Sequence, residues 1–288
     1  MKRFGALAFI LMTSWVAWAG VGTAAVGAAA STGSLPPVGG IPMVRATTPG
    51  ASSLPVLSLN WSGYAATANT KFKYVHSEFL QPALKCTGTP DQWTSNWVGL
   101  DGFTSDTVEQ DGTFAWCGGP SFTTPKYAAW YEFYPANTVV LYAVKPGDLI
   151  EDSVTYNAGQ YNLTVSDLSS HKTGTDVGAC TVGCQRNSAE WIIERPAECN
   201  DAGTKCEILA LADFKTSTMS DNIAQAANGP ATGINGFNNY SIDMVTPLKK
   251  GFTSLDTVGG VDPTTDSFTA TWDRSGQPVP ITLGPNAA

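Results

Sequence analysis

Histidine is scarce in this chain, and the zinc and nucleophile motifs of common hydrolases are missing. Its two histidines, His76 and His171, are not spaced as the zinc-binding motif His-Glu-x-x-His. No Gly-x-Ser-x-Gly elbow presents a nucleophilic serine, and no paired Asp-Thr/Ser-Gly motifs occur. A Ser-His-Asp triad on either histidine stays open, because triads are recognised by geometry. The sequence therefore favours carboxylate and amide chemistry, and we expect neither a metal nor another cofactor.

Charge is also low, and acidic residues outnumber basic ones. Asp, Glu, Lys and Arg make up 14% of the chain, and the formal net charge is −8. This negative balance argues against nucleic acid or an anionic membrane as a partner. A protein with few ion pairs loses little stability when its carboxylates are protonated, so the composition suits acid surroundings. It is equally typical of secreted β-proteins in general.

Only the N-terminus carries a long apolar run. Lys2 and Arg3 precede an uncharged stretch over residues 4–30, with small-residue cleavage options at 17–19 and 28–30. This layout predicts a secretory signal peptide rather than an uncleaved anchor, because the second half of the stretch is mostly Gly, Ala and Thr. No later segment has the ~20 continuous apolar residues that a membrane span needs. We therefore expect a secreted, extracellular protein with no membrane association after cleavage.

The rest of the chain divides into two parts by composition. Residues 31–56 are rich in Pro, Gly, Ser and Thr and hold a single charge, Arg45, which indicates a linker or a short propeptide. Residues 57–288 are enough for one large domain, which we expect to be monomeric. Six cysteines in an exported chain predict disulfides, but spacing alone leaves fifteen possible connectivities.

Period-two alternation of apolar and polar residues recurs throughout this domain, and no stretch keeps a helical period. Many short strands separated by turn residues predict an all-β sandwich or barrel. At most, Asp221–Ala227 could form a turn or two of helix. The expected strands are Phe72–Leu80, Ser95–Leu100, Tyr127–Tyr134, Val139–Val144, Leu149–Tyr156, Tyr161–Leu168, Glu190–Glu194, Ile208–Lys215, Tyr240–Val245, Ser267–Trp272 and Val279–Leu283.

Alternation also predicts which side chains share a face of a strand. Between Tyr127 and Tyr134, the residues Ala128, Trp130, Glu132 and Tyr134 should point one way. Trp97 and Asp101 should likewise share a face, as should Glu190, Ile192 and Glu194. Aromatic and acidic side chains on one sheet face can form a groove for an extended polymer.

Five segments in order together resemble the glutamic peptidases, or eqolisins. They are Asn60-Trp61-Ser62-Gly63-Tyr64, Trp97-Val98-Gly99-Leu100-Asp101-Gly102, Thr107-Val108-Glu109-Gln110-Asp111-Gly112, Tyr127-Ala128-Ala129-Trp130-Tyr131-Glu132-Phe133-Tyr134-Pro135 and Ser188-Ala189-Glu190-Trp191-Ile192-Ile193-Glu194-Arg195-Pro196. The wording of the motifs is closer to bacterial than to fungal members. The resemblance implies a two-sheet antiparallel β-sandwich of the concanavalin A-like kind, with bent sheets that form a substrate groove.

The resemblance makes Gln110 and Glu194 the candidate catalytic dyad of an acid endopeptidase. Peptide hydrolysis needs a group that takes a proton from water and a donor that stabilises the oxyanion. By resemblance Glu194 takes the first role and Gln110 the second. A Glu near its unperturbed pKa of about 4.3 populates both protonation states, as a group that acts first as base and then as acid requires.

Further residues carry roles only by resemblance. Asp101 would lie near the dyad and orient Gln110 or hold a water, and Trp61, Trp97, Trp130 and Glu132 would line the substrate cleft. Cys199 and Cys206 match a small disulfide loop of the family, which leaves Cys86 with Cys117 and Cys180 with Cys184 as the natural remaining pairs. For the tryptophans, plain core packing is an equal alternative.

A second class of function uses the same side chains differently. Glu132, Asp101 and Glu194 could provide the carboxylate pair of a glycosidase, with tryptophans stacking on sugar rings. A third hypothesis is a lectin-like or peptide-binding module that has kept the groove without catalysis. Fold alone does not choose among these functions, so the geometry of Gln110 and Glu194 decides.

Overall fold

Extended strands make up nearly all the regular structure of this protein. The computed structural model describes residues 38–46, 55–180, 182–200, 204–227 and 229–283. All of them belong to one unit that begins at Ser34, so the expected signal peptide at 1–30 lies outside the described residues and stays a prediction. In these ranges the one helical element is the 3₁₀ turn η1 (Ile234–Gly236), and no helix is long and apolar enough to cross a membrane.

The largest sheet has ten strands and carries the motif residues. Its main path is β19 (Phe252–Ser254), β18 (Asn238–Pro247), β3 (Trp61–Thr67), β12 (Ser188–Glu194), β5 (Gln92–Leu100), β6 (Val108–Gly118), β7 (Thr124–Tyr134) and β8 (Val139–Ala143). Neighbours on this path are antiparallel, whereas β15 (Ala210–Leu211) joins β5 and β2 (Val56–Ser58) joins β18 in parallel. The five motif segments therefore lie along five neighbouring strands, in the order β3, β12, β5, β6 and β7.

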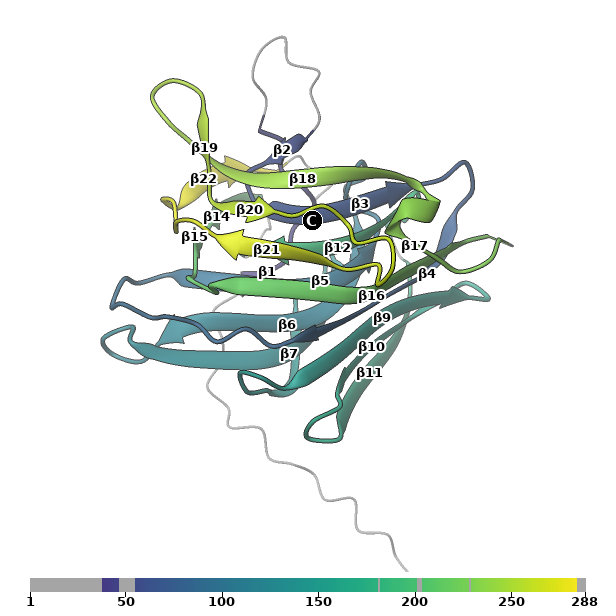
Figure 1. Ribbon diagram of the computed structural model, residues 1–288, viewed down its shortest axis with the longest axis horizontal. Coiled ribbons are helices and arrows are strands. Elements are labelled where there is room, and N and C mark those ends of the chain that lie inside the picture. Colours follow the sequence, from purple (N-terminus) through teal and green to yellow (C-terminus); the bar gives the residue numbers. More distant parts are fainter. Residues whose placement is uncertain (1–37, 47–54, 181, 201–203, 228, 284–288) are drawn as a thin grey trace, which may run out of the picture. The chain divides into compact units, whose positions relative to one another are not determined.

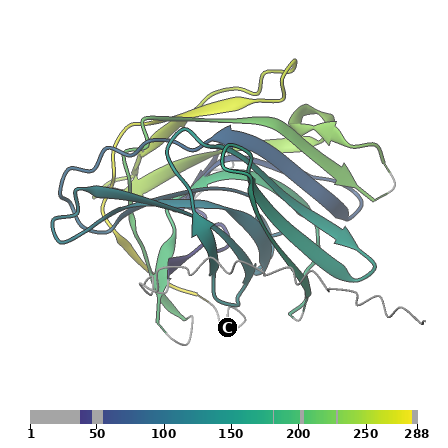
Figure 2. The same ribbon diagram turned by 90° about the horizontal axis from the view of Figure 1, so that it is seen from below.

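The second sheet has eight strands and lies against the first, and both sheets are visibly curved (Figures 1 and 2). Its path is β11 (Lys172–Ala179), β10 (Gln160–Asp167), β9 (Leu149–Asn157), β4 (Phe72–Leu80), β16 (Thr216–Ala226), β21 (Phe268–Trp272) and β20 (Asp256–Val258), with β17 (Thr232–Gly233) paired to β16. A third sheet has the order β1 (Val38–Gly39), β13 (Ala197–Cys199), β14 (Lys205–Ile208) and β22 (Val279–Thr282).

Alternation sorts the side chains of the ten-stranded sheet into two apolar clusters. One face contributes Val98, Leu100, Trp191 and Ile193 to a core shared with Phe79 and other residues of the eight-stranded sheet. The opposite face contributes Trp61, Trp97, Trp130 and Ile192 to a cluster shared with residues of the four-stranded sheet. The β-sandwich predicted from the sequence is therefore confirmed, with a third, smaller sheet in addition.

Three disulfides link segments of the sandwich. Cys86 is bonded to Cys117, Cys180 to Cys184, and Cys199 to Cys206. The first joins the chain after β4 to the end of β6, and the last lies across the β13–β14 pair, where Cys199 and Cys206 are directly opposite. These are the pairs that the family resemblance implied.

Two segments differ from the sequence prediction. Asp221–Ala227 falls almost wholly within strand β16 and not in a helical turn, because its pairing with β4 shifts register between Ser220 and Ile223 and this shift breaks the period-two pattern. Ile208–Lys215 is not one strand. Ile208 ends β14 and pairs with β22, whereas Ala210–Leu211 pairs with β5, so the chain changes partners in between.

Strand β6 was not expected from the sequence, because Asp and Gly are depleted in strands. Pairing on both sides, with β5 and β7, overrides this local preference. Gly112 is required by close packing, since a Cβ atom there would lie 2.1 Å from the Asn96 carbonyl oxygen. Gln110 is thereby fixed in the middle of the largest sheet.

Several carboxyl groups lie buried inside the sandwich. Asp111 of β6 and Asp152 of β9 are fully buried, and burial raises the pKa of each well above its usual value, with the charge of Asp152 adding to the effect on Asp111. Burial also raises the pKa of Glu109 to about 8 and that of Asp256 to about 7. The folded state therefore holds these groups protonated at acid pH.

We predict that the protein is most stable in acid. A carboxyl whose pKa is higher in the folded state contributes its full stability below about pH 4 and loses it as the pH rises through 7 to 8, at up to ~1.4 kcal/mol per pH unit and per group. Urea unfolding measured from pH 3 to 8 should show the free energy of unfolding falling steadily. Asp111→Asn should flatten this fall, whereas Asp91→Asn, at an exposed site, should not. A free energy that is constant over this range would contradict the prediction.

Candidate active site

Gln110 lies at the centre of the ten-stranded sheet, on the face turned away from the eight-stranded one. It is opposite Gly99 of β5 and Glu132 of β7. Its amide nitrogen donates a hydrogen bond of 2.8 Å to Oε2 of Glu132, whose Oε1 accepts one of 2.9 Å from the Thr138 hydroxyl. Two neighbouring strands and the β7–β8 turn therefore hold this amide in one orientation.

Glu194 is the last residue of β12 and is fully buried. Its Oε2 accepts a 2.8 Å hydrogen bond from the Trp97 indole nitrogen of the adjacent strand β5. Its Oε1 accepts from the Asn60 side-chain amide at 3.1 Å and from the backbone N–H of Ile41 at 3.2 Å. The carboxyl is thus surrounded by N–H donors and has no cationic partner among these contacts.

Burial raises the pKa of both Glu194 and Glu132. Burial raises the pKa of Glu194 to about 8, against the lowering effect of the hydrogen bonds from Ile41, Asn60 and Trp97. Burial also raises the pKa of Glu132 well above its usual value, and the negative charge of Glu194 adds to that rise. The two carboxyls therefore sense each other electrostatically, and both hold their protons more tightly than an exposed Glu.

Gln110 and Glu194 face the same side of the sheet and reach the same stretch of backbone. A Cβ atom on Gly40 would lie 2.5 Å from the Gln110 amide nitrogen, and the next residue, Ile41, donates its N–H to Glu194. With ordinary backbone dimensions the two functional groups cannot be farther apart than about 10 Å. The structure thus brings together the two residues that the sequence proposed as the dyad.

The three tryptophans and Glu132 have distinct surroundings. Trp97 contacts Glu194, and the Trp61 indole nitrogen donates a 3.0 Å hydrogen bond to the carbonyl of Ile41. Trp130 is fully buried, stacks on Phe114 with ring centroids 4.5 Å apart, and donates to the Ser95 hydroxyl. Trp61 and Trp97 therefore border the dyad, Trp130 packs on Phe114 in the same apolar cluster, and Glu132 contacts Gln110 directly.

Asp101 has contacts other than those expected from the sequence. Its carboxylate accepts the backbone N–H groups of Gln185, Arg186 and Asn187 at 2.7, 2.6 and 2.9 Å. The residue has a φ of 75°, so it turns the chain after β5 and ties it to the loop before β12. The partner that orients Gln110 is Glu132, because it is the acid directly opposite on the neighbouring strand.

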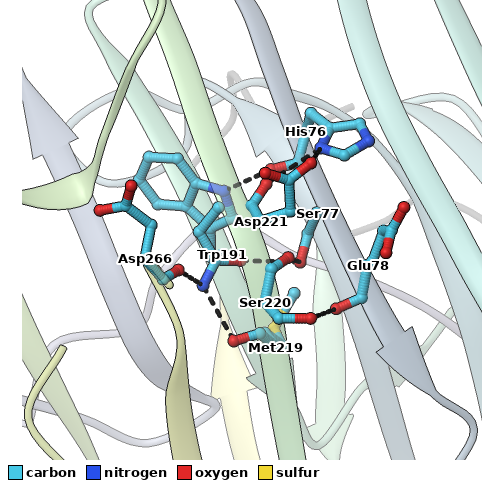
Figure 3. A network of polar contacts seen from close by, with 9 residues as sticks. His76, Ser77, Glu78, Trp191, Met219, Ser220, Asp221 and Asp266 are labelled. Atoms are coloured by element: carbon cyan, nitrogen blue, oxygen red, sulfur yellow. Dashed lines mark hydrogen bonds and ion pairs between the residues drawn. The ribbon is translucent and has the colours of Figure 1, made fainter. Parts of the chain in front are cut away.

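The histidines do not form a serine triad in the described part of the chain. His76 contacts Asp221, with Nδ1 3.0 Å from the carbonyl oxygen and 3.6 Å from the carboxylate, as Figure 3 shows. Nearby hydroxyls bond elsewhere: Ser77 donates to Asn222 at 2.7 Å, and Ser220 to the Glu78 carbonyl at 3.1 Å. His171 is exposed in the turn between β10 and β11.

Two groups of residues in the described ranges have potential metal-ligand atoms within 4.8 Å of one another. The first is Glu109 with Cys180 and Cys184, whose sulfur atoms are bonded to each other in a disulfide. The second is His76 with Glu78 and Glu151, on β4 and β9 of the eight-stranded sheet. Neither group includes Gln110 or Glu194, so the dyad is separate from both.

Three further contacts at the site were not predicted from the sequence. Asn60, Thr138 and Ile41 each donate a hydrogen bond to Glu194 or Glu132. Asn60 could have been identified, since it opens the first of the five motif segments. Thr138 and Ile41 stand outside those segments in a turn and in the presumed linker, and no local pattern marks them.

Comparison with known proteins identifies the family to which this chain is related. The model of the Peptidase A4 family matches residues 59–259. Scytalidopepsin B of Scytalidium lignicola is 28% identical over 183 residues, which are 61% of this chain and 66%, just under two thirds, of that protein.

Solved structures share the fold. A crystal structure of scytalido-glutamic peptidase with a transition state analog inhibitor matches with a TM-score of 0.63 and 22% identity, over 74% of this chain and 98% of that one. Aspergilloglutamic peptidase from Aspergillus niger matches with a TM-score of 0.51 and 26% identity, over 63% and 99% of the two chains. Because the family model matches well over half of the chain, this protein belongs to the Peptidase A4 family, and the resemblance of its motifs to the glutamic peptidases is confirmed.

Proposed function

We propose that this protein is a secreted acid endopeptidase that hydrolyses polypeptides with Gln110 and Glu194 as its catalytic dyad. The observation that carries the proposal is that both side chains contact adjacent residues, Gly40 and Ile41, of a single stretch of peptide backbone. A site that already accommodates a peptide on the two functional groups is suited to a polypeptide substrate.

In this mechanism the groove opens to solvent, which relieves the burial that raises the pKa of Glu194. The carboxylate form of Glu194 then accepts a proton from a water molecule, whose oxygen attacks the carbonyl carbon of the scissile peptide. The Gln110 amide N–H stabilises the negative charge that develops on the carbonyl oxygen. Glu194 then gives the proton to the leaving nitrogen, and the C–N bond breaks. Because one carboxyl takes and returns the proton, the cycle needs no metal.

Glu132 acts through Gln110 and not on the substrate. Its carboxyl accepts the Gln110 N–H, while the Thr138 hydroxyl fixes the other oxygen. An oriented amide loses less conformational freedom when the transition state forms, and this pre-organisation strengthens its effect on the oxyanion. We therefore assign Glu132 as a positioning residue.

Two features support acid conditions and secretion. The buried carboxyls favour the folded state at acid pH, where the enzyme would have to remain intact. The three disulfides are typical of an oxidising compartment, in agreement with the signal peptide expected over residues 1–30. Residues 57–288 then form the peptidase domain of a monomeric enzyme, and residues 31–56 precede it as a propeptide.

The glycosidase alternative receives less support from the site. It requires two carboxyls facing each other across a groove with Gln110 elsewhere. Instead, the amide of Gln110 lies directly on Glu132 and beside the same backbone that Glu194 contacts. The family match also favours the peptidase over a sugar-binding module.

We predict that Glu194→Gln abolishes acid proteolysis. The substitution preserves size and one acceptor oxygen but removes the carboxyl that carries the proton, so kcat should fall at least ~10³-fold. The assay is digestion of casein or denatured haemoglobin at acid pH, with pepstatin and a chelator present. Glu207→Gln, at an exposed position of strand β14, is the matched control and should keep full activity. Equal activity of the Glu194 variant and the unaltered protein would refute the assignment.

We also predict graded effects at Glu132. Glu132→Ala leaves Gln110 without its acceptor and should lower kcat by ~10²-fold, since an unoriented oxyanion donor is nearly as poor as a missing one. Glu132→Gln keeps a carbonyl acceptor and should recover most of the rate. KM should change little in either variant. A rise in KM with unchanged kcat would instead show that Glu132 binds substrate.

A further inference from the structure

The outer face of the eight-stranded sheet carries a group of metal-ligand side chains that the proposed peptidase site does not use. His76 and Glu78 lie two residues apart on β4, and Glu151 of β9 is directly opposite Glu78. Since Val75 and Phe79 of β4 belong to the main core, His76 and Glu78 point away from it. One ring nitrogen of His76 and one carboxylate oxygen of each Glu lie within 4.8 Å of one another. Two adjacent strands therefore bring three metal-ligand atoms together.

The two glutamates of this group repel each other. Glu78 and Glu151 face each other across an antiparallel strand pair, where two like charges destabilise the sheet. In the described ranges neither side chain has a hydrogen bond or an ion pair, and the one ion pair found there joins His76 to Asp221. The Asp221 carboxylate adds a third negative charge beside the group. A cation between the two Glu side chains would replace this repulsion by attraction.

His76 is held in place with one ring nitrogen left for a ligand. The residue is 8% exposed, and its ring stacks on Tyr74 with ring centroids 6.1 Å apart. Its Nδ1 lies 3.0 Å from the Asp221 carbonyl oxygen, which only accepts, so Nδ1 carries the proton and donates it (Figure 3). In the neutral ring Nε2 then keeps its lone pair, and no described residue forms a hydrogen bond with it. Histidines that bind a metal through one nitrogen almost always donate the other N–H to a carbonyl or carboxylate in this way.

A β-bulge in β16 puts Asp221 against the histidine. The register of β16 with β4 shifts at this point, and Asp221 has a φ of 50°. The fully buried side chain of Asn222 fixes the bulge, since its Nδ2 donates to the carbonyls of Met219 and Asp266 at 3.0 and 2.7 Å. Bulges are over-represented next to functional sites, where they re-aim a side chain. Here the bulge fixes the tautomer and the orientation of His76.

One imidazole nitrogen with two carboxylate oxygens favours zinc. Zinc binds nitrogen and oxygen ligands at about 2.0–2.2 Å, whereas calcium and magnesium take oxygen ligands. Ligand atoms around one tetrahedral zinc ion are about 3.3–3.6 Å apart, so separations of up to 4.8 Å have to shrink by about 1 Å. Glu78 and Glu151 are only half-buried, and rotation of their side chains can provide this change. Water would complete the coordination.

We propose that His76, Glu78 and Glu151 bind one zinc ion, with Asp221 as the acceptor that orients the histidine. The ion joins β4 to β9, and because it binds the folded chain it stabilises the eight-stranded sheet. The site is on the other sheet from the candidate dyad, so this zinc takes no part in the proposed catalytic cycle. The sequence did not predict it, because Glu151 comes from a strand remote along the chain.

The first test measures zinc binding to the full-length protein without a polyhistidine tag. After dialysis against a chelator and then buffer at pH 7.5, where the ligands can bind deprotonated, zinc chloride is titrated in a calorimeter. We expect one zinc ion per chain, and a loss of affinity of at least ~100-fold in His76→Ala and in Glu151→Gln. His171→Ala changes the other histidine, exposed in the β10–β11 turn, and should bind zinc like the unaltered protein.

Three results of this titration would overturn the proposal. The first is no zinc binding by the unaltered protein. The second is an affinity that either His76→Ala or Glu151→Gln leaves unchanged, since the ion would then lie elsewhere. The third is tighter binding of calcium or magnesium than of zinc, which would contradict a histidine ligand.

The second test follows thermal unfolding at pH 7.5. Zinc at about 100 times its dissociation constant should raise the unfolding temperature of the unaltered protein by about 5–10 °C, and Glu151→Gln should lose this shift. In chelator, Glu151→Gln should unfold at the same or a higher temperature, because it removes one of two like charges. A full zinc shift in this variant, or a lower unfolding temperature in chelator, would refute the site.

Zinc binding and the proposed peptidase activity can fail separately. His76→Ala should keep acid proteolysis of casein, and Glu194→Gln should keep zinc binding, since the two sites lie on different sheets. If the protein binds zinc through His76 but does not digest casein, only the proposed function is wrong. Loss of zinc binding in Glu194→Gln would place the ion at the dyad and overturn the site proposed here.

Discussion

The structure depends on keeping one carboxyl group, that of Glu194, inside a protein without a cation beside it. The group is tolerable there because Trp97, Asn60 and Ile41 direct N–H donors at its two oxygens. These donors come from the neighbouring strand β5, from the residue before β3 and from the N-terminal segment. The ten-stranded sheet must therefore be assembled in its correct register before the site exists.

The two faces of the ten-stranded sheet have different roles, one in stability and the other in the chemistry of the site. One face packs against the eight-stranded sheet and supplies the main core, in which Asp111 and Asp152 are buried. The other carries Gln110, Glu132 and Glu194 among tryptophans. Since strands alternate, a residue needed for the core and a residue needed for the site can be neighbours in sequence, as Gln110 and Asp111 are.

Raised pKa values are found on both faces, with a common cause. Burial without a cationic partner favours the protonated form of Glu194 and Glu132 in the site and of Asp111 and Asp152 in the core. For the core, this ties the folded state to acid conditions. In the site, the pKa of Glu194 depends on whether water reaches the carboxyl. Binding of a peptide in the groove and protonation of Glu194 are therefore linked.

Local sequence patterns were enough to predict several strands, the faces of their side chains, the family and the candidate dyad. Alternation gave the strands Phe72–Leu80 and Tyr127–Tyr134 and the common face of Trp130, Glu132 and Tyr134, because a residue's side in a strand depends only on its position in the pleat. Motif wording indicated the family and named Gln110 and Glu194. These properties are carried by residues close together in the chain.

Tertiary structure alone decided the contacts between distant segments. The family resemblance implied that Asp101 lies near the dyad and orients Gln110 or holds a water. Pairing of β6 with β7 instead puts Glu132 on Gln110, and Asp101 accepts hydrogen bonds from the loop before β12. The sequence showed residues 38–46 only as part of a Pro- and Gly-rich stretch. In the folded protein, the backbone of this segment contacts Gln110 and Glu194. Such contacts depend on strand order and register, which are set by the packing of the whole sheet and not by neighbouring residues.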